Sequence, residues 1–154
     1  MDETKRILIV EDMEATREGL ADLLRSWGYR VDIFDGGGRA LEFLQAGPRP
    51  DLILLDLLLR RDMNGWQFLE VAKAEPRLQQ IPVIAISGAD LTPEQRIRCN
   101  AEEFMSKPLD ARRLIALLQR YGFPPPASRG AVAKAMPDSG PAHEGVLGAV
   151  VESS

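Results

Sequence analysis

Short apolar runs alternate with amphipathic stretches from about residue 5 to residue 122. Runs of Val, Ile and Leu bounded by polar residues are typical of strands buried on both faces of a parallel sheet. One run alternates more strongly and predicts an edge strand, Arg30–Phe34. The other predicted strands are Arg6–Val10, Asp51–Asp56, Pro82–Ile86 and a weaker fifth, Glu103–Ser106.

Between the predicted strands, apolar residues recur at helical spacing. The stripes that mark the first three helices are Leu20-Leu23-Leu24-Trp27, Leu41-Leu44 and Phe68-Leu69-Ala72. Gly28 can end the first helix in the left-handed conformation, the pair Gly47-Pro48 ends the second, and the third ends before Pro76. Trp27 is expected to pack in the core.

Two further helices have clear starting signals. Thr92 followed by Pro93, Glu94 and Gln95 combines a capping threonine, a first-turn proline and a glutamine that reaches back to the cap. Asp110 caps the last helix, whose apolar face is Leu114, Leu117, Leu118 and Tyr121. The element order βαβαβαβαβα predicts an α/β fold, a doubly wound five-stranded parallel sheet with helices on both faces.

The domain is expected to span residues 1–122. From Phe123 onward, Pro, Gly, Ala and Ser dominate, and such a segment buries too little apolar surface to offset its ordering entropy. Residues 123–154 are therefore predicted to be a disordered tail. The mildly apolar stretch from Val146 to Val151 is interpreted as a frayed terminus, with docking on a partner as the alternative.

Charge and cysteine content narrow the function. The chain carries 19 Lys and Arg against 23 Asp and Glu, and this balance argues against a broad nucleic-acid surface. Cys99 is the only cysteine, so an internal disulfide is excluded and a reducing compartment is expected. No leader peptide or membrane-length apolar run is evident, so we expect a cytoplasmic protein without a membrane partner.

Polar side chains follow four of the predicted strands. Glu11-Asp12 follows the first, Asp56 ends the third, Ser87-Gly88 follows the fourth, and Lys107-Pro108 follows the fifth. Ligands of such sheets bind at the carboxyl ends of the strands, so these groups are expected to converge. Each element alone is weak, because acidic pairs and strand-end aspartates are common in solvated turns. Their combination in this chain order is far more specific.

Three clustered carboxylates require either a retained proton or a bound cation. All-oxygen ligands suit a hard cation such as Mg²⁺. A lysine and a hydroxyl opposite the metal would serve an anion, most simply a phosphoryl group. Because the chain offers no credible catalytic histidine or cysteine (its one histidine, His143, lies in the tail), Asp56 is the candidate nucleophile.

Residues 5–122 resemble the receiver domain of bacterial response regulators. The motifs that carry the resemblance are ILIVED (7–12), DLILLDLLL (51–59), MNGWQFL (63–69), PVIAISG (82–88) and EFMSKPL (103–109). The resemblance implies a flavodoxin-like fold with strand order 2-1-3-4-5. It also implies that a sensor histidine kinase or a histidine phosphotransfer protein donates a phosphoryl group to Asp56.

The resemblance also implies the remaining roles. Asp12, Asp56 and the backbone carbonyl of Leu58 would hold Mg²⁺, with Glu11 acting mainly through water. Lys107 would pair with the phosphoryl oxygens, and its bond to Pro108 is expected to be cis. The Ser87 hydroxyl would bond the phosphate, and Phe104 would be the aromatic residue that turns inward as the following loop moves.

The chain departs from the family pattern in three places. The Asp56–Gly65 loop is about one residue longer than usual, and Arg60, followed by Arg61, stands where the family commonly has a proline. Those two arginines could bind an anion or an acidic partner, or simply form an exposed charged loop. The fourth helix is short, extending only from about Pro93 to Cys99, and Phe104 lacks the hydroxyl of a switch tyrosine.

Three hypotheses remain. The first is a stand-alone receiver that is phosphorylated and then switches a contact with an unknown downstream protein or relays its phosphoryl group. The second is a receiver-fold binding module that works without phosphate, suggested by the altered loop and short fourth helix. The third, an enzyme of the haloacid dehalogenase type, is rejected because Leu58 stands where a second aspartate is required. The triplet Gly36-Gly37-Gly38 is interpreted as a flexible turn rather than a phosphate-binding loop.

Overall fold

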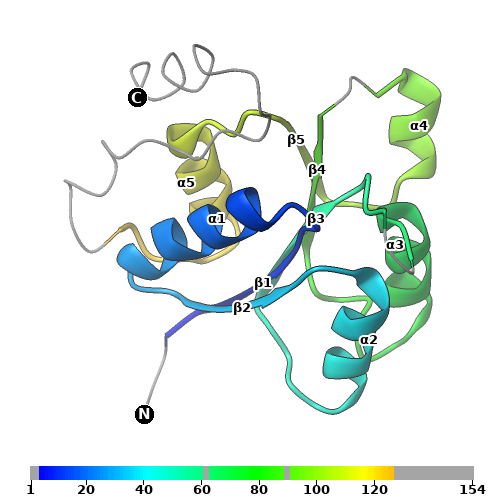
Figure 1. Cartoon of the computed structure of the whole chain (residues 1–154), viewed down its shortest axis with the longest axis horizontal. Helices are drawn as coiled ribbons and strands as arrows, with labels where there is room; N and C mark the ends of the chain where they lie inside the picture. Colours follow the sequence, from blue (N-terminus) through cyan, green and yellow to red (C-terminus); the bar gives the residue numbers. More distant parts are fainter. Residues whose placement is uncertain (1–3, 61–62, 89–90, 127–154) are drawn as a thin grey trace.

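A computed structural model describes residues 4–60, 63–88 and 91–126 (Figure 1). Strands and helices alternate throughout, as the sequence pattern predicts. The strands are β1 (Arg6–Val10), β2 (Arg30–Phe34), β3 (Leu52–Asp56), β4 (Val83–Ser87) and β5 (Glu103–Ser106). The helices are α1 (Glu14–Ser26), α2 (Gly37–Gln45), α3 (Gly65–Ala74), α4 (Pro93–Arg98) and α5 (Ala111–Arg120).

The five strands form one parallel sheet in the order β2-β1-β3-β4-β5, which confirms the predicted flavodoxin-like fold. β2 lies at an edge, as its alternating pattern predicts. β3 lies in the middle, between β1 and β4, and is buried along its whole length. The carboxyl end of β3 is therefore surrounded by the carboxyl ends of its neighbours.

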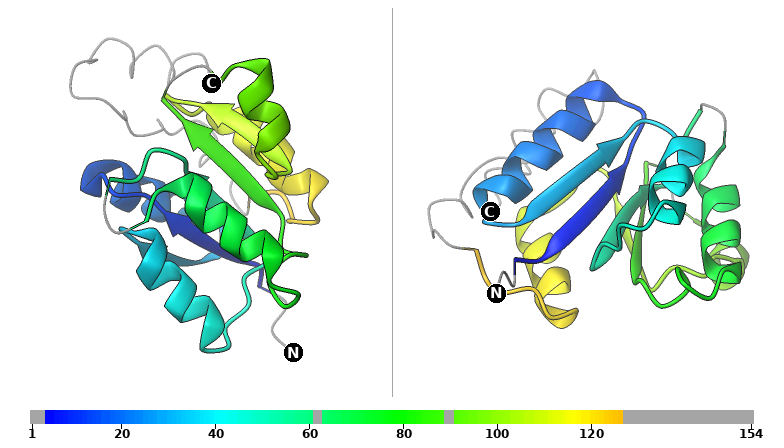
Figure 2. Two further views of the ribbon diagram at one scale, coloured as in Figure 1. Left: turned by 90° about the vertical axis from the view of Figure 1, so that its right-hand side faces the viewer. Right: turned by 90° about the horizontal axis from the view of Figure 1, so that it is seen from below.

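Successive residues of each strand point to opposite faces of the sheet, so one sheet supports two cores. Ile7 and Ile9 face the core beneath α1 and α5, whereas Leu8 and Val10 face the core beneath α2 and α3. The three views show these pairs of helices on opposite faces (Figures 1 and 2). Trp27 is buried in the first core, as expected.

Most helix boundaries follow the signals in the sequence. Gly28 has a φ of 100° immediately after α1, a backbone conformation that favours glycine. Thr92 and Gln95 form the predicted capping box of α4, and Asp110 caps α5. Helix α4 is short, as predicted, and contributes no buried residue.

The glycine triplet is not a flexible turn. Gly36 is the N-cap of α2, and Gly37 and Gly38 form the first turn of this helix. Position 37 is also closely packed, because a Cβ on Gly37 would lie 3.2 Å from Met63, which is tighter than most Cβ contacts. A helix N-terminus also tolerates glycine well, because its first amides have no intrahelical partner.

The predicted boundary after Gly122 is too early. Phe123 is buried in the core, its amide donates to the Leu118 carbonyl (3.0 Å), and its ring meets Tyr29 edge-to-face at a centroid distance of 5.3 Å. The Tyr29 hydroxyl donates to the Pro124 carbonyl. The composition of residues 123–154 predicts a tail, but a single aromatic side chain at position 123 anchors its first residues to the core. The rest of the predicted tail, 127–154, lies outside the described residues.

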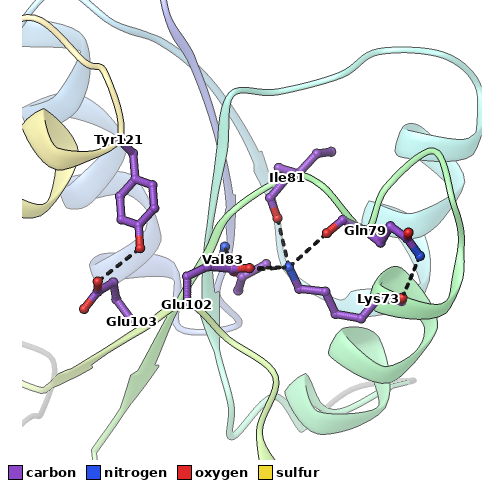
Figure 3. Close-up of polar contacts among 7 residues, drawn as sticks. All are labelled: Lys73, Gln79, Ile81, Val83, Glu102, Glu103 and Tyr121. Carbon is purple, nitrogen blue, oxygen red and sulfur yellow. Dashed lines mark hydrogen bonds and ion pairs between the residues drawn. The ribbon is translucent and has the colours of Figure 1, made fainter.

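A charged clamp joins α3 to the amino ends of β4 and β5 (Figure 3). The Lys73 ammonium donates to the carbonyls of Gln79 and Ile81 and to the Glu102 carboxylate at 2.9 Å. Glu102 also accepts from the Val83 amide at 2.7 Å. This clamp lies at the end of the sheet opposite to Asp56. Among the residues that the model describes, no helix has the length and apolar character needed to span a membrane.

Candidate phosphoacceptor and metal site

Three carboxylates meet at the carboxyl end of the sheet. Asp56 is the last residue of β3, and Glu11 and Asp12 directly follow β1. One carboxylate oxygen from each lies within 4.8 Å of the others. Glu11 and Asp56 are buried, whereas Asp12 is partly exposed. The parallel pairing of β1 with β3 causes this convergence, because it places both strand ends side by side.

Lys107 enters the same site from the loop after β5. Its Nζ atom lies 2.9 Å from Glu11 Oε1 and 3.2 Å from Asp56 Oδ2, and its side chain is mostly buried. Its backbone amide donates to the Ser87 carbonyl at 2.9 Å, which anchors the loop to the end of β4. The peptide bond between Lys107 and Pro108 is cis.

The Asp56 carboxylate is held at both oxygens. Oδ2 contacts Lys107, and Oδ1 accepts from the backbone amide of Leu58 at 2.9 Å. A short hydrogen bond of this kind within a turn fixes the side-chain orientation of the aspartate. The Asp56 side chain therefore has one defined orientation at the carboxyl end of the central strand.

The site carries more negative than positive charge. Burial, followed by the nearby Asp56 carboxylate, raises the pKa of Glu11 to about 7, although Lys107 and the Met13 amide act in the opposite direction. Burial lowers the pKa of Lys107, but the Glu11 and Asp56 carboxylates outweigh this effect and the pKa is raised overall. A single ammonium therefore leaves the cluster short of positive charge.

These residues fit a divalent cation. The donors are carboxylate oxygens, which are the ligands that Mg²⁺ and Ca²⁺ accept, and they are close enough to share one ion. The raised pKa of Glu11 shows that its buried carboxylate is disfavoured beside Asp56. A bound cation would stabilise both carboxylates. Mg²⁺ fits best, because it takes few carboxylates and keeps several waters.

The other predicted residues surround this cluster. Ser87 is buried at the end of β4, one position beyond the Asp56–Ile86 pair. Leu58 has a half-exposed side chain in the loop after β3. Phe104 lies on β5, partly buried, with the Arg96 guanidinium over its ring at 5.1 Å from the centroid. Arg61 and His143 lie outside the described residues.

The sequence interpretation missed two residues that shape the site. Arg17, on the first turns of α1, donates to the backbone carbonyl of Glu11 at 3.1 Å and fixes the acidic loop. Gly65, the first residue of α3, packs directly against the backbone of Asp56 and Leu57. Nothing in a single sequence separates Arg17 from a solvated arginine, whereas a glycine at a helix start beside a functional loop is a usable signal.

A doubly wound parallel sheet with an acidic cluster and a lysine at the carboxyl ends of its strands defines a class of α/β proteins that can bind a metal ion and an anion at that end. Residues 7–119 match the response regulator receiver domain family, and the chain belongs to this family. Phosphorylation on an aspartate is general in the family, whose members are signalling switches rather than classical enzymes.

Relatives come from plants and bacteria. Two-component response regulator ORR11 of Oryza sativa subsp. indica is 34% identical over 116 residues, which cover 71% of this chain and 78% of the relative. Polar-differentiation response regulator DivK of Brucella ovis is 34% identical over 120 residues, covering 77% and 96%. Because both kingdoms are represented, a bacterial origin stays a prediction.

Solved structures show the same likeness. The receiver domain of a signal transduction histidine kinase from Syntrophus aciditrophicus is 33% identical, with a TM-score of 0.69 and coverage of 77% and 89%. The receiver domain of a sensor histidine kinase from Pseudomonas aeruginosa PAO1 is 28% identical, with a TM-score of 0.70 and coverage of 77% and 97%. That protein has a magnesium ion coordinated in its active-site cleft.

Proposed function

We propose that this chain is a response regulator that accepts a phosphoryl group on Asp56 in a Mg²⁺-dependent reaction. The observation that carries the proposal is the position of Asp56 at the end of the central strand, 3.2 Å from Lys107 and within the acidic cluster. The donor would be a phosphohistidine of a sensor kinase or a phosphotransfer protein. Its P–N bond breaks as a P–O bond to Asp56 forms, and the imidazole leaves with the electron pair.

The side chains around Asp56 have complementary roles in this proposal. Asp12, Asp56 and the Leu58 carbonyl would hold Mg²⁺, with Glu11 acting mainly through water. The bound ion would neutralise charge on the phosphoryl oxygens. Lys107 supplies positive charge from the other side, and its two present carboxylate contacts hold it in place until a phosphoryl group arrives. The Leu58 amide keeps the Asp56 carboxylate oriented for in-line transfer.

The output proposed here is a change of protein contact. The Ser87 hydroxyl would turn to the phosphoryl group, and Phe104 would move inward as the loop after β4 shifts. The downstream partner would be a protein, or a second histidine if the chain relays its phosphoryl group. We propose further that the chain acts alone, as a single receiver in the cytoplasm, without a nucleic-acid or membrane partner.

The decisive experiment is intact-mass measurement after incubation with Mg²⁺ and acetyl phosphate. The parent chain should gain one phosphoryl group, and Asp56→Asn should gain none. Asp51→Asn is the matched control, because Asp51 precedes the same strand at its opposite end and accepts from the Arg6 amide. Removing Mg²⁺ should abolish the gain.

A parent chain that is never modified, even with several histidine kinases supplied, would refute the proposal. The receiver-fold module that works without phosphate would then be favoured. One structural observation suits it: α4 is only six residues long and contributes no residue to the core.

A further inference from the structure

We propose that the backbone amide of Arg60 is a positioning group for the metal site. This inference rests on the proposed Mg²⁺ site and names one backbone group that positions its ligand Asp12. The Arg60 amide donates to Asp12 Oδ2 at 3.0 Å, across 48 positions of sequence. A hydrogen bond of this length from a backbone N–H is well formed. It ties the loop after β3 to the acidic loop after β1.

Two separate contacts fix Asp12, one at its backbone and one at its side chain. Arg17 donates to the Asp12 carbonyl at 3.5 Å and to the Glu11 carbonyl at 3.1 Å, which secures the main chain. The Arg60 amide secures the carboxylate. It engages one oxygen and leaves the other oxygen of the carboxylate available to a cation.

Fixing this carboxylate matters because Asp12 is the partly exposed member of the cluster. Glu11 and Asp56 are each held by Lys107 and by a backbone amide, from Met13 and Leu58 respectively. Without the Arg60 amide, Asp12 would have to lose side-chain rotamer freedom when it binds a metal ion. Hydrogen bonds to metal-ligating carboxylates are worth about 10- to 100-fold in affinity.

This contact restricts which residues can stand at position 60. Any residue except proline supplies the donor, because proline alone lacks a backbone N–H. The resemblance leads one to expect proline at this position, and a proline there could not hold Asp12. The arginine side chain is exposed, and the positioning role belongs to the main chain. Because coupling between two equilibria is reciprocal, occupancy of the metal site should in turn steady this loop.

The test compares Arg60→Pro with Arg60→Ala, which removes the side chain but keeps the amide. Mg²⁺ binding is measured by calorimetric titration on the full chain. We expect Arg60→Pro to bind Mg²⁺ about 10-fold more weakly and Arg60→Ala to stay within about twofold of the parent. Equal affinity of the parent and Arg60→Pro, or equal weakening in both variants, would overturn the inference.

Failure of the wider proposal gives a different result. If the parent binds no Mg²⁺, the metal assignment and this inference fall together. If the parent binds Mg²⁺ but is never phosphorylated, only the proposed function fails.

A second measurement does not depend on the proline variant folding. Hydrogen exchange of the Arg60 amide, followed in the metal-free chain, should be at least about 10-fold faster in Asp12→Ala than in the parent, because the acceptor is gone. Asp22→Ala, which alters an exposed aspartate of α1, is the matched control and should leave this amide unchanged. Equal exchange in the parent and Asp12→Ala would refute the hydrogen bond on which the inference stands.

Discussion

Gly65 lies against the backbone of Asp56 so closely that it has no room for a side chain. A Cβ at position 65 would approach the Asp56 carbonyl oxygen at 2.4 Å and the Leu57 Cα at 2.5 Å. Its amide donates to the Leu57 carbonyl at 3.3 Å. The amino end of α3 therefore packs against the peptide bond that follows Asp56. Only glycine at position 65 allows the two backbones to lie this close.

Gly65→Ala should therefore shift the backbone at Asp56. Backbone atoms cannot yield as a flexible side chain does, so we expect a loss of about 1–3 kcal/mol in the free energy of unfolding. Phosphorylation by acetyl phosphate should slow at the same time. Urea denaturation and intact mass measure the two effects. Gly88→Ala is the control for stability, since its Cβ would meet only Lys107 Cδ at 3.9 Å and the free energy of unfolding should not fall.

The pKa of Glu11 predicts a pH dependence of stability. Burial and Asp56 raise this pKa from 4.5 to about 7, so the folded chain retains a proton that the unfolded chain releases. The stabilisation that comes from this retained proton is complete below pH 4.5 and is lost as pH rises through about 7. In metal-free buffer the free energy of unfolding should fall over this window by up to about 3 kcal/mol.

Glu11→Gln should flatten that fall, because glutamine does not titrate. Glu14→Gln, an exposed glutamate on α1, should leave it in place. Saturating Mg²⁺ should restore stability at neutral pH in the parent chain. A parent whose stability is constant from pH 4.5 to pH 7 in the absence of metal would contradict the assigned pKa.

The clamp around Lys73 should be worth more than a surface ion pair. Lys73→Met removes the donor to two backbone carbonyls and to Glu102, in a place where the lysine side chain is only 10% exposed. Hydrogen bonds made by a charged donor of this kind contribute about 1.5–3 kcal/mol. Arg120→Gln breaks the exposed Arg120–Glu103 pair and should cost less than about 1 kcal/mol. Similar losses in urea denaturation would show that Lys73 has no special role.

Phe123 should behave as a core residue rather than as part of a tail. A chain ending at Gly122 should be less stable than one ending at Pro126, because the first loses the ring that packs on Tyr29. Phe123→Ala in the full chain should cost about 3 kcal/mol. Pro125→Ala, at an exposed position, is the control. Equal thermal stability of the two truncated chains would place the domain boundary back at Gly122.

The order of elements could be predicted because each follows a local rule. Arg6–Val10 is apolar on both faces, Gly28 ends a helix, and Thr92 begins one, and none of these depends on distant residues. The convergence of Asp12, Asp56 and Lys107 follows from topology, since carboxyl ends of parallel strands share one edge. The prediction of the site needed no knowledge of distances.

The features that escaped prediction all depend on tertiary contacts. Gly37 starts a helix with Met63 close beside it, and the buried Phe123 ring packs on Tyr29. The contact between Arg60 and Asp12 joins residues 48 positions apart through a backbone atom that every residue but proline possesses. A pattern of side-chain types cannot reveal a contact made by the main chain.

Helix α4 stands apart from the other helices in Figure 1, and all six of its residues are exposed, with Ile97 at 82%. Such a helix adds almost nothing to the apolar burial that sustains the fold. Its amides should therefore exchange with solvent through local opening, at a free energy well below that of global unfolding. The stability of the fold depends on the other four helices and the sheet. Helix α4 can therefore refold against a partner while the sheet stays intact.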